Sequence, residues 1–161
     1  MICAQNHVSL STIMATPLPS KRVQRRGNYK PTRQQIIDVY NAINVEVFNG
    51  QLVRPSILTR SLAKEWGWCV IQDDATTQVK LKIDKTIYCI QWFVTILAHE
   101  MVHQYQWQVN GPVLKSNNQE PILDHGGTFL AFKGKLAEFG IPLLEMYDDK
   151  KWFAHQDLMK L

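Results

Sequence analysis

The chain has 161 residues, of which 45% are hydrophobic and 20% charged, the composition of a single globular domain with a proper core. No stretch approaches the roughly 18–20 apolar residues that span a bilayer, and the first 20 residues lack a signal-peptide pattern. Three widely spaced cysteines, Cys3, Cys69 and Cys89, form neither a disulfide framework nor a metal knuckle. We therefore expect a cytoplasmic protein without membrane contact, in which Cys69 and Cys89 are core thiols.

The positive charge is concentrated near the start of the chain. Residues 1–37 carry six basic and no acidic side chains, whereas residues 38–161 carry 12 basic and 14 acidic ones, so +6 and −2 give the formal net charge of +4. Prolines and a glycine interrupt residues 1–31, which predicts a flexible basic arm ahead of a single domain over 32–161. The arm can bind DNA phosphates or be a solvated tail, and the sequence leaves both open. The candidate DNA-binding residues are Lys21, Arg22, Arg25, Arg26, Lys30 and Arg33.

The first predicted helix of the domain begins after Thr32 and ends at Asn49-Gly50. Thr32 and Gln35 form a capping box, and apolar residues follow at helical spacing up to Phe48. The Asn-Gly pair tolerates the positive φ that ends a helix. The hydrophobic period then becomes that of strands, which we expect at 56–59, 67–71 and 79–83, with the last two forming an antiparallel hairpin.

The most informative stretch is His99-Glu100-Met101-Val102-His103, within a predicted helix over 90–108. Histidines four residues apart lie on one face of a helix, about one turn apart, where both can bind one zinc ion. Glu100 lies beside them as a proton acceptor. The residues before the motif contain no Gly or Pro and are apolar nearly all round, which indicates an internal helix. Burying such polar groups without partners is costly, so we favour a metal site over two core histidines.

A catalytic zinc site takes three protein ligands, so a third is required. The remaining histidines are His7 in the expected arm, His125 and His155. His125 lies 22 residues beyond His103, after a loop over 110–124 that is long enough to fold the next helix, expected over 127–139, back onto the first. Two glycines after it allow a close backbone approach. We therefore expect one zinc ion per chain on His99, His103 and His125, with His155, Glu120 and Asp124 as alternative third ligands.

Three neutral imidazoles would leave the metal its full charge, which lowers the pKa of water and polarises a substrate carbonyl. Glu100 would accept a proton from water and deliver it to the leaving amine, which is peptide-bond hydrolysis without a covalent intermediate. Tyr105 and Tyr147 can each stabilise the oxyanion or simply pack, and the sequence assigns neither role. We expect Trp66, Trp68 and Trp92 to pack in the core rather than stack on bases, and an amphipathic helix within 145–161.

Four stretches together resemble a known family: 40–57, Gly67-Trp68 with 79–83, 97–105, and His125-Gly126-x-x-Phe129. They are similar to the first helix and strand, the hairpin, the active-site helix and the third-ligand motif of the SprT-like zinc metalloproteases. The resemblance covers about residues 36–140. It implies an α+β fold with a zincin-like metalloprotease core, composed of an N-terminal helix, a small antiparallel sheet, an HExxH helix and a following helix with the third ligand.

The same resemblance implies a function. His99, His103 and His125 would be the zinc ligands and Glu100 the catalytic acid and base of an endopeptidase. Members of the family degrade proteins on DNA, including covalent DNA–protein crosslinks, typically under the control of DNA binding. Many carry a cysteine-rich zinc ribbon after the core, whereas no cysteine follows Cys89 here, and such a compact core also suits a phage-encoded member. Two alternatives stay open: a non-catalytic DNA-binding or assembly protein with a zincin core, and a zinc peptidase unrelated to nucleic acid.

Overall fold

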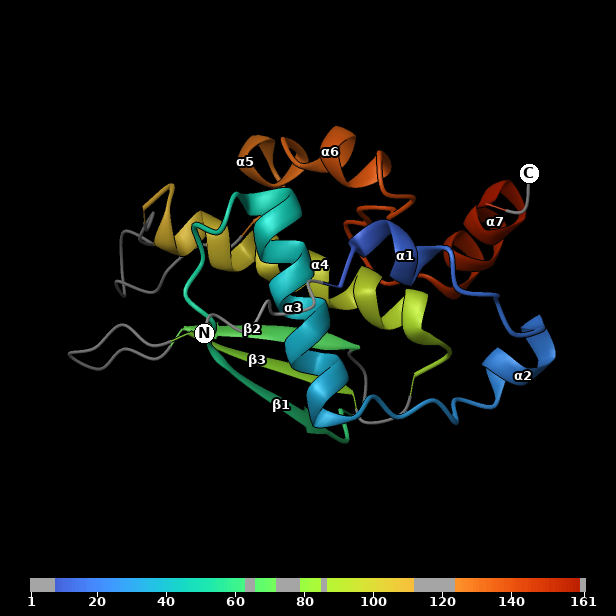
Figure 1. Ribbon diagram of the computed structural model, residues 1–161. Coiled ribbons are helices and arrows are strands. Elements are labelled where there is room, and N and C mark those ends of the chain that lie inside the picture. Colours follow the sequence, from blue (N-terminus) through green and yellow to red (C-terminus); the bar gives the residue numbers. More distant parts are fainter. Residues whose placement is uncertain (1–7, 63–65, 72–78, 85–86, 112–123, 160–161) are drawn as a thin grey trace, which may run out of the picture.

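The computed structural model describes residues 8–62, 66–71, 79–84, 87–111 and 124–159, which form a mixed α+β structure with one small sheet (Figure 1). Its helices are α1 (Leu10–Met14), α2 (Lys21–Arg25), α3 (Arg33–Phe48), α4 (Ile90–Gln108), α5 (Gly127–Leu130), α6 (Lys133–Ala137) and α7 (Asp149–Met159). Its strands are β1 (Ser56–Arg60), β2 (Gly67–Ile71) and β3 (Val79–Asp84). Among the described residues, none of the helices combines the length and the apolar character needed to cross a membrane.

Helix α3 begins and ends where the sequence predicts. The Thr32 hydroxyl accepts from the Gln35 backbone N–H (3.1 Å), and the Gln35 side chain accepts from the Thr32 N–H (2.9 Å), so the capping box is confirmed. Asn49 then adopts a left-handed conformation with φ of 55°. The helix packs against α4, where the buried Tyr40 hydroxyl donates to Gln104 Oε1 (2.9 Å).

The three strands form a mixed sheet in the order β1-β3-β2. The predicted hairpin is confirmed, because β2 and β3 pair in antiparallel fashion, but β1 pairs with β3 in parallel, so the expectation of an antiparallel sheet is wrong. Strands β1 and β2 run in opposite directions and both pair with β3, so one pair must be parallel. On the face towards α4, Cys69, Leu81 and Ile83 are buried.

The aromatic and cysteine predictions for the core hold with one exception. Trp92 is fully buried, and Cys69 and Cys89 are 7% and 2% exposed, so both thiols are core residues. Burial raises the pKa of Cys89 to about 11, as expected of an unreactive thiol. Trp68 is 57% exposed, which contradicts its predicted place in the core. Strand alternation explains this, because its neighbour Cys69 occupies the buried face.

Residues 8–31 lie against the domain, where the sequence predicts a flexible arm over 1–31; the first seven residues are outside the described part. Leu10 and Ile13 of α1 are 0% and 6% exposed and belong to the core. Gln24 of α2 is fully buried and hydrogen-bonded to Gln156 of α7. Two apolar residues in one turn are too short a pattern to show periodicity, and a buried glutamine resembles a surface residue in sequence.

The C-terminal third contains shorter helices than predicted. The helix expected over 127–139 is divided into α5 and α6 by a turn at Ala131 and Phe132, and α6 ends at Ala137, ahead of Gly140 with φ of 75°. The predicted terminal helix is present as α7, whose Trp152 and Phe153 are 0% and 7% exposed. Most of the predicted loop over 110–124 lies outside the described residues.

Candidate metal centre

Helix α4 places two histidines of the motif side by side in the interior. Of its 19 residues, 15 are buried, which confirms the prediction of an internal helix over 90–108. His99 and His103 are 5% and 6% exposed, and their ring centroids lie 5.0 Å apart on one face of the helix. The side chains thus have the spacing that a shared metal ion requires.

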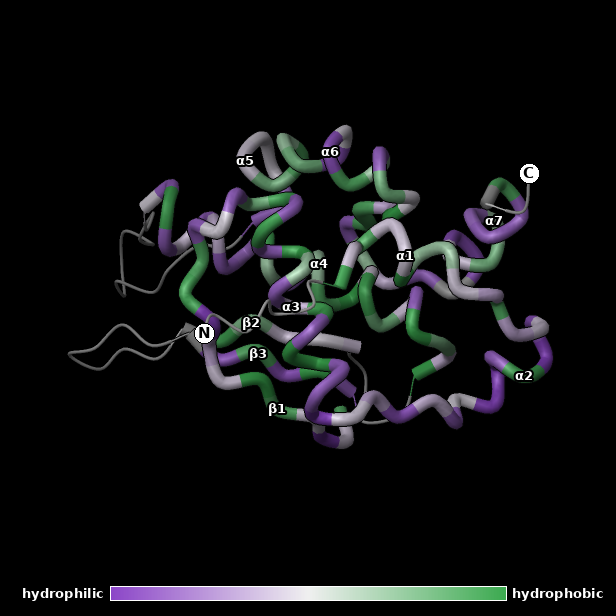
Figure 2. Tube along the Cα trace, in the orientation of Figure 1, coloured by the Kyte–Doolittle hydropathy of each residue, from purple (hydrophilic) through white to green (hydrophobic). Residues whose placement is uncertain are grey.

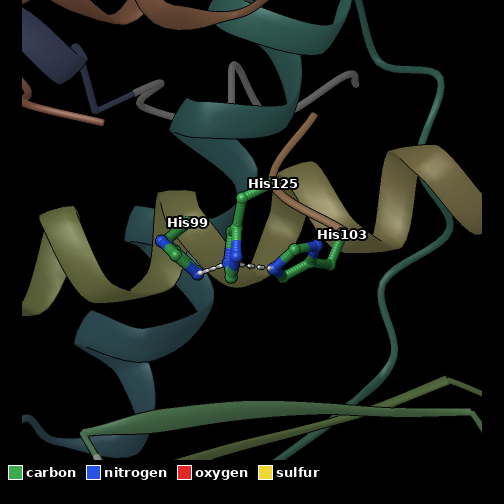
Figure 3. A group of neighbouring side chains, drawn as sticks. All are labelled: His99, His103 and His125. Atoms are coloured by element: carbon green, nitrogen blue, oxygen red, sulfur yellow. Dashed lines mark hydrogen bonds between the residues drawn. The ribbon is translucent and has the colours of Figure 1, made fainter. Parts of the chain in front are cut away.

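His125 completes the cluster from the segment that leads into α5. Figure 3 shows its ring entering between the two α4 histidines. Its Nε2 atom lies 3.2 Å from His103 Nε2 and 3.3 Å from His99 Nε2, and the possible ligand atoms of all three lie within 4.8 Å of one another. The predicted grouping of the three histidines is therefore confirmed, although His99 and His125 are 26 positions apart in the sequence.

Phe129 of α5 supports all three rings. It is fully buried, and its ring centroid lies 4.9 Å from that of His99, 5.0 Å from that of His103 and 4.7 Å from that of His125. The sequence resemblance includes this phenylalanine only as part of a motif. Its position shows that it restricts how far each imidazole can turn.

Hydrogen bonds on the other ring nitrogens set the tautomers. His99 Nδ1–H donates to the carbonyl oxygen of Leu144 (2.7 Å), and His103 Nδ1–H donates to Gln106 Oε1 (2.7 Å). Because neutral imidazole carries one N–H, both Nε2 atoms keep a free lone pair. The Gln106 amide nitrogen donates in turn to Thr128 Oγ1 (2.8 Å) and to the Asp124 carbonyl oxygen (3.1 Å), which ties α4 to the segment carrying His125.

Burial keeps these imidazoles neutral. It lowers the pKa of His99 to about 3, with further lowering from His103 and His125, and burial also lowers the pKa of His103. At neutral pH the two rings are therefore unprotonated at Nε2. Three convergent imidazole nitrogens, two of them with fixed tautomers, suit a divalent transition metal ion, so the residues fit the expected metal.

Glu100 lies beside this cluster. Its side chain is 4% exposed, and its Oε1 atom lies 4.0 Å from His99 Nε2. The Tyr147 hydroxyl donates to the same oxygen at 2.6 Å. Gly67 of β2 also packs against this side chain, since a Cβ atom there would lie 3.2 Å from Glu100 Cγ. The carboxylate thus has a defined position next to the three nitrogens.

The other candidate residues lie elsewhere or outside the described part. His155 Nε2–H donates to the Gly140 carbonyl oxygen (2.8 Å), so His155 is not part of the cluster. The Asp124 carbonyl oxygen accepts from the Gln106 side chain and supplies no ligand atom to the cluster. His7 and Glu120 are not among the described residues. Tyr105 packs against the rings of Phe48 and Phe132, with centroid distances of 5.5 Å and 4.8 Å.

Sequence reasoning missed the contact between Tyr147 and Glu100, because it considered Tyr147 only as an oxyanion stabiliser or a packing residue. Tyr147 lies 47 positions after Glu100, and no residue spacing connects the two. A tyrosine in an irregular segment between two helices carries no pattern of its own, so only the folded chain shows the contact.

The predicted DNA-binding residues do not form one uniform group. Lys21 makes an ion pair with Asp157 of α7 (2.9 Å), and the Arg25 guanidinium lies 4.5 Å above the Phe153 ring. The remaining predicted residues are exposed: Arg22, Arg26, Lys30 and Arg33. Helix α2 is largely hydrophilic and lies beyond the N-terminal end of α4 (Figures 1 and 2).

Comparison with known proteins assigns the chain to no family. No protein-family model matches it, and no curated protein matches its sequence significantly. The chemistry of the site therefore has to follow from its geometry.

Proposed function

We propose that the protein is a zinc-dependent endopeptidase with a zincin-like core. The observation that carries this proposal is the convergence of three imidazole nitrogens beside a buried carboxylate. A helix that supplies two histidines and the glutamate between them, with a third histidine from a later segment, is the arrangement used for metal-assisted hydrolysis.

Zinc is the metal that this ligand set suits best. His99, His103 and His125 would hold one ion per chain, and three neutral nitrogen ligands leave a fourth position for the reaction. Zinc bound there would polarise a substrate carbonyl and make water a stronger nucleophile at neutral pH. The uncharged ligands would leave the positive charge of the ion undiminished for both effects.

Glu100 supplies the proton transfers in this proposal. Its carboxylate accepts a proton as the oxygen of water adds to the carbonyl carbon of the peptide bond. The C–N bond then breaks, and Glu100 returns the proton to the departing amine nitrogen. Its Oε1 atom lies 4.0 Å from His99 Nε2, and this supports the role, because a carboxylate this close to the proposed ligands can reach a water molecule beside the metal.

Strand β2 provides a surface on which a peptide substrate can lie. It is at the edge of the sheet, and among the described strands it pairs only with β3. Gly67, its first residue, lies against Glu100. An extended peptide that hydrogen-bonds to the free edge of β2 would therefore pass close to the carboxylate.

DNA-associated and DNA-crosslinked proteins are the proposed substrates. The resemblance to SprT-like proteases supports this, together with the exposed basic residues near α2, among them Arg22 and Arg26. These residues belong to a folded segment, so their charges have defined positions rather than following a loose tail. Lys21 contributes less, because its charge is paired with Asp157.

The experiment that tests the peptidase is Glu100→Gln. We expect this variant and the wild type each to bind about one zinc ion per chain. The rate of proteolysis should fall by about 10²–10⁴-fold in the variant, because the amide has the shape of the carboxylate but accepts no proton. Zinc is measured by metal analysis and proteolysis by cleavage of casein or histone. Glu138→Gln, on the exposed end of α6, is the control and should keep full activity. Full activity in Glu100→Gln would refute the mechanism.

The same assay with and without single-stranded DNA distinguishes the alternatives. Stimulation by DNA supports a DNA-linked protease, equal cleavage in both conditions supports a peptidase unrelated to nucleic acid, and DNA binding without cleavage supports a non-catalytic protein. Replacing Arg22, Arg25 and Arg26 by alanine should flatten the salt dependence of single-strand binding. Up to three lost phosphate contacts correspond to roughly 2 units of log–log slope. An unchanged slope would exclude α2 as the DNA contact.

A further inference from the structure

Tyr147 joins the segment between α6 and α7 to the proposed catalytic carboxylate. Its hydroxyl lies 2.6 Å from Glu100 Oε1 and 3.3 Å from the Ile96 carbonyl oxygen. A phenol has one proton to donate, and the shorter contact is to the charged acceptor. A distance of 2.6 Å is typical of an O–H group that donates to a carboxylate, a stronger bond than one between neutral groups.

The same short segment also orients a metal ligand. Leu144, three residues before Tyr147, accepts from His99 Nδ1 through its carbonyl oxygen. The Tyr147 ring packs against His99 with 4.7 Å between ring centroids, and against Trp92 at 6.0 Å. One stretch of four residues therefore fixes both a ligand and the carboxylate beside it.

Burial explains why Glu100 needs such a partner. Its side chain is 4% exposed, so few water molecules can solvate the charge, and a buried carboxylate without donors is costly. Glutamate also has three rotatable bonds, so the helix alone does not fix the direction of its oxygens. The bond from Tyr147 holds Oε1 and thereby orients the carboxylate.

We propose that Tyr147 is a positioning residue that holds Glu100 in the orientation needed for proton transfer. This inference rests on the proposed peptidase function and adds a residue to it. Tyr147 acts through Glu100 and supplies no ligand to the metal. Substitution by phenylalanine should therefore affect the rate of the chemical step and leave the metal in place.

The kinetic test compares Tyr147→Phe with Tyr105→Phe. Both variants lose one hydroxyl and keep the ring, but Tyr105 packs against Phe48 and Phe132 and is not hydrogen-bonded to Glu100 in the structure. We expect Tyr147→Phe to lower kcat by about 10–100-fold, with KM changed less than about twofold and one zinc per chain, as for loss of a residue that orients a reacting group. Tyr105→Phe should keep wild-type kcat. Wild-type kcat in Tyr147→Phe would overturn the inference.

A second measurement tests the contact without zinc or catalysis. In the metal-free protein, a double-mutant cycle of Tyr147→Phe and Glu100→Ala compares the unfolding equilibrium constants of the four forms. We expect the effect of Tyr147→Phe on the unfolding equilibrium constant to be about tenfold larger in the wild type than in Glu100→Ala. In Glu100→Ala the hydrogen bond between the two side chains is already lost, so Tyr147→Phe cannot remove it again. The cavity left by Glu100→Ala cancels because it is present on both sides of the comparison. Coupling below about twofold would overturn the inference.

The two proposals fail in different ways. A wild-type protein that binds zinc but cleaves no protein refutes the peptidase and, with it, a role of Tyr147 in proton transfer, even where the coupling is measured. An active wild type with an equally active Tyr147→Phe refutes only the role of Tyr147.

Discussion

Individual residues next to His99 and His103 determine which ring nitrogen of each faces the candidate metal position. The partner of His99 is a backbone carbonyl, which substitution cannot remove, whereas the partner of His103 is the Gln106 side chain. Gln106 also reaches the segment that carries His125, through Thr128 and the Asp124 backbone. Of the two contacts that orient the histidines, only the one made by the Gln106 side chain can therefore be removed by mutation.

We expect Gln106→Ala to weaken zinc binding by about 10–100-fold, because His103 loses its orienting acceptor and the His125 segment loses a tether. Competition with a chromogenic chelator measures the affinity. Gln108→Ala, two residues further along α4 and exposed, removes an amide that has no contact with the histidines and should leave the affinity unchanged. Equal affinities in the two variants would show that Gln106 does not orient His103.

Among the secondary-structure elements, those with local signals were predictable and those that depend on distant partners were not. The capping box at Thr32 and the apolar run of α4 are patterns formed by residues close in the sequence. Helices α3 and α4 therefore have the bounds that the sequence predicts. The place of β3 between β1 and β2 is not local, since each strand has the same alternation whichever neighbour it takes. The same limit applies to α1, whose burial depends on α3 and α4.

The residues of the candidate site also differ in whether a local sequence pattern predicts them. The four-residue interval between His99 and His103 is helix geometry and was readable from the sequence. His125 was reached by elimination among few histidines, and the structure confirms its place in the cluster. Tyr147 and Gln106 act through contacts that depend on side-chain direction, so the sequence contains no spacing that would predict them.

The packing of β2 on α4 leads to a prediction for Gly67. An added Cβ atom would lie 2.8 Å from Ile96 Cγ2 and 3.2 Å from Glu100 Oε1, closer than packed atoms allow. We expect Gly67→Ala to lower the free energy of unfolding by about 1–3 kcal/mol and to reduce proteolysis, because the strand or the carboxylate has to move. Chemical denaturation and the cleavage assay measure the two effects.

Gly134 of α6 offers the matched control for this substitution. A Cβ atom added there meets nothing within 4 Å, and alanine is a better helix former than glycine. Gly134→Ala should therefore keep or slightly raise the stability and leave proteolysis unchanged. A similar response in both variants would contradict the close approach of β2 to α4.

On the scale of the whole molecule, Gln24 connects the first and last parts of the chain. Its amide nitrogen donates to the Pro19 carbonyl oxygen (2.8 Å) and to Gln156 Oε1 (2.7 Å). Its amide oxygen accepts from Gln156 Nε2 (3.0 Å) and from Trp152 Nε1 (3.2 Å), and Cys89 Sγ lies 3.6 Å away. Helices α2 and α7 and the start of α4 thus meet around one buried amide.

We expect Gln24→Ala to lower the free energy of unfolding by about 2–5 kcal/mol, because the buried amide of Gln156 and the indole N–H of Trp152 would lose partners. Denaturant titration in the metal-free protein measures this effect. Gln34→Ala, which removes an exposed amide on α3, should change the stability by less than about 0.5 kcal/mol. A similarly small change in Gln24→Ala would mean that the N-terminal segment contributes little to the domain.

The position of Gln24 also has a consequence for the order of events during biosynthesis. Its partner Gln156 lies 132 residues later, so at typical rates of about 5–20 residues per second the ribosome adds the partner roughly 7–26 s afterwards. During that interval α2 cannot pack against α7, and we expect water to hydrogen-bond to the side-chain amide of Gln24. Helix α2 is therefore made before His99, His103 and His125 but reaches its final environment only after all three have been synthesised.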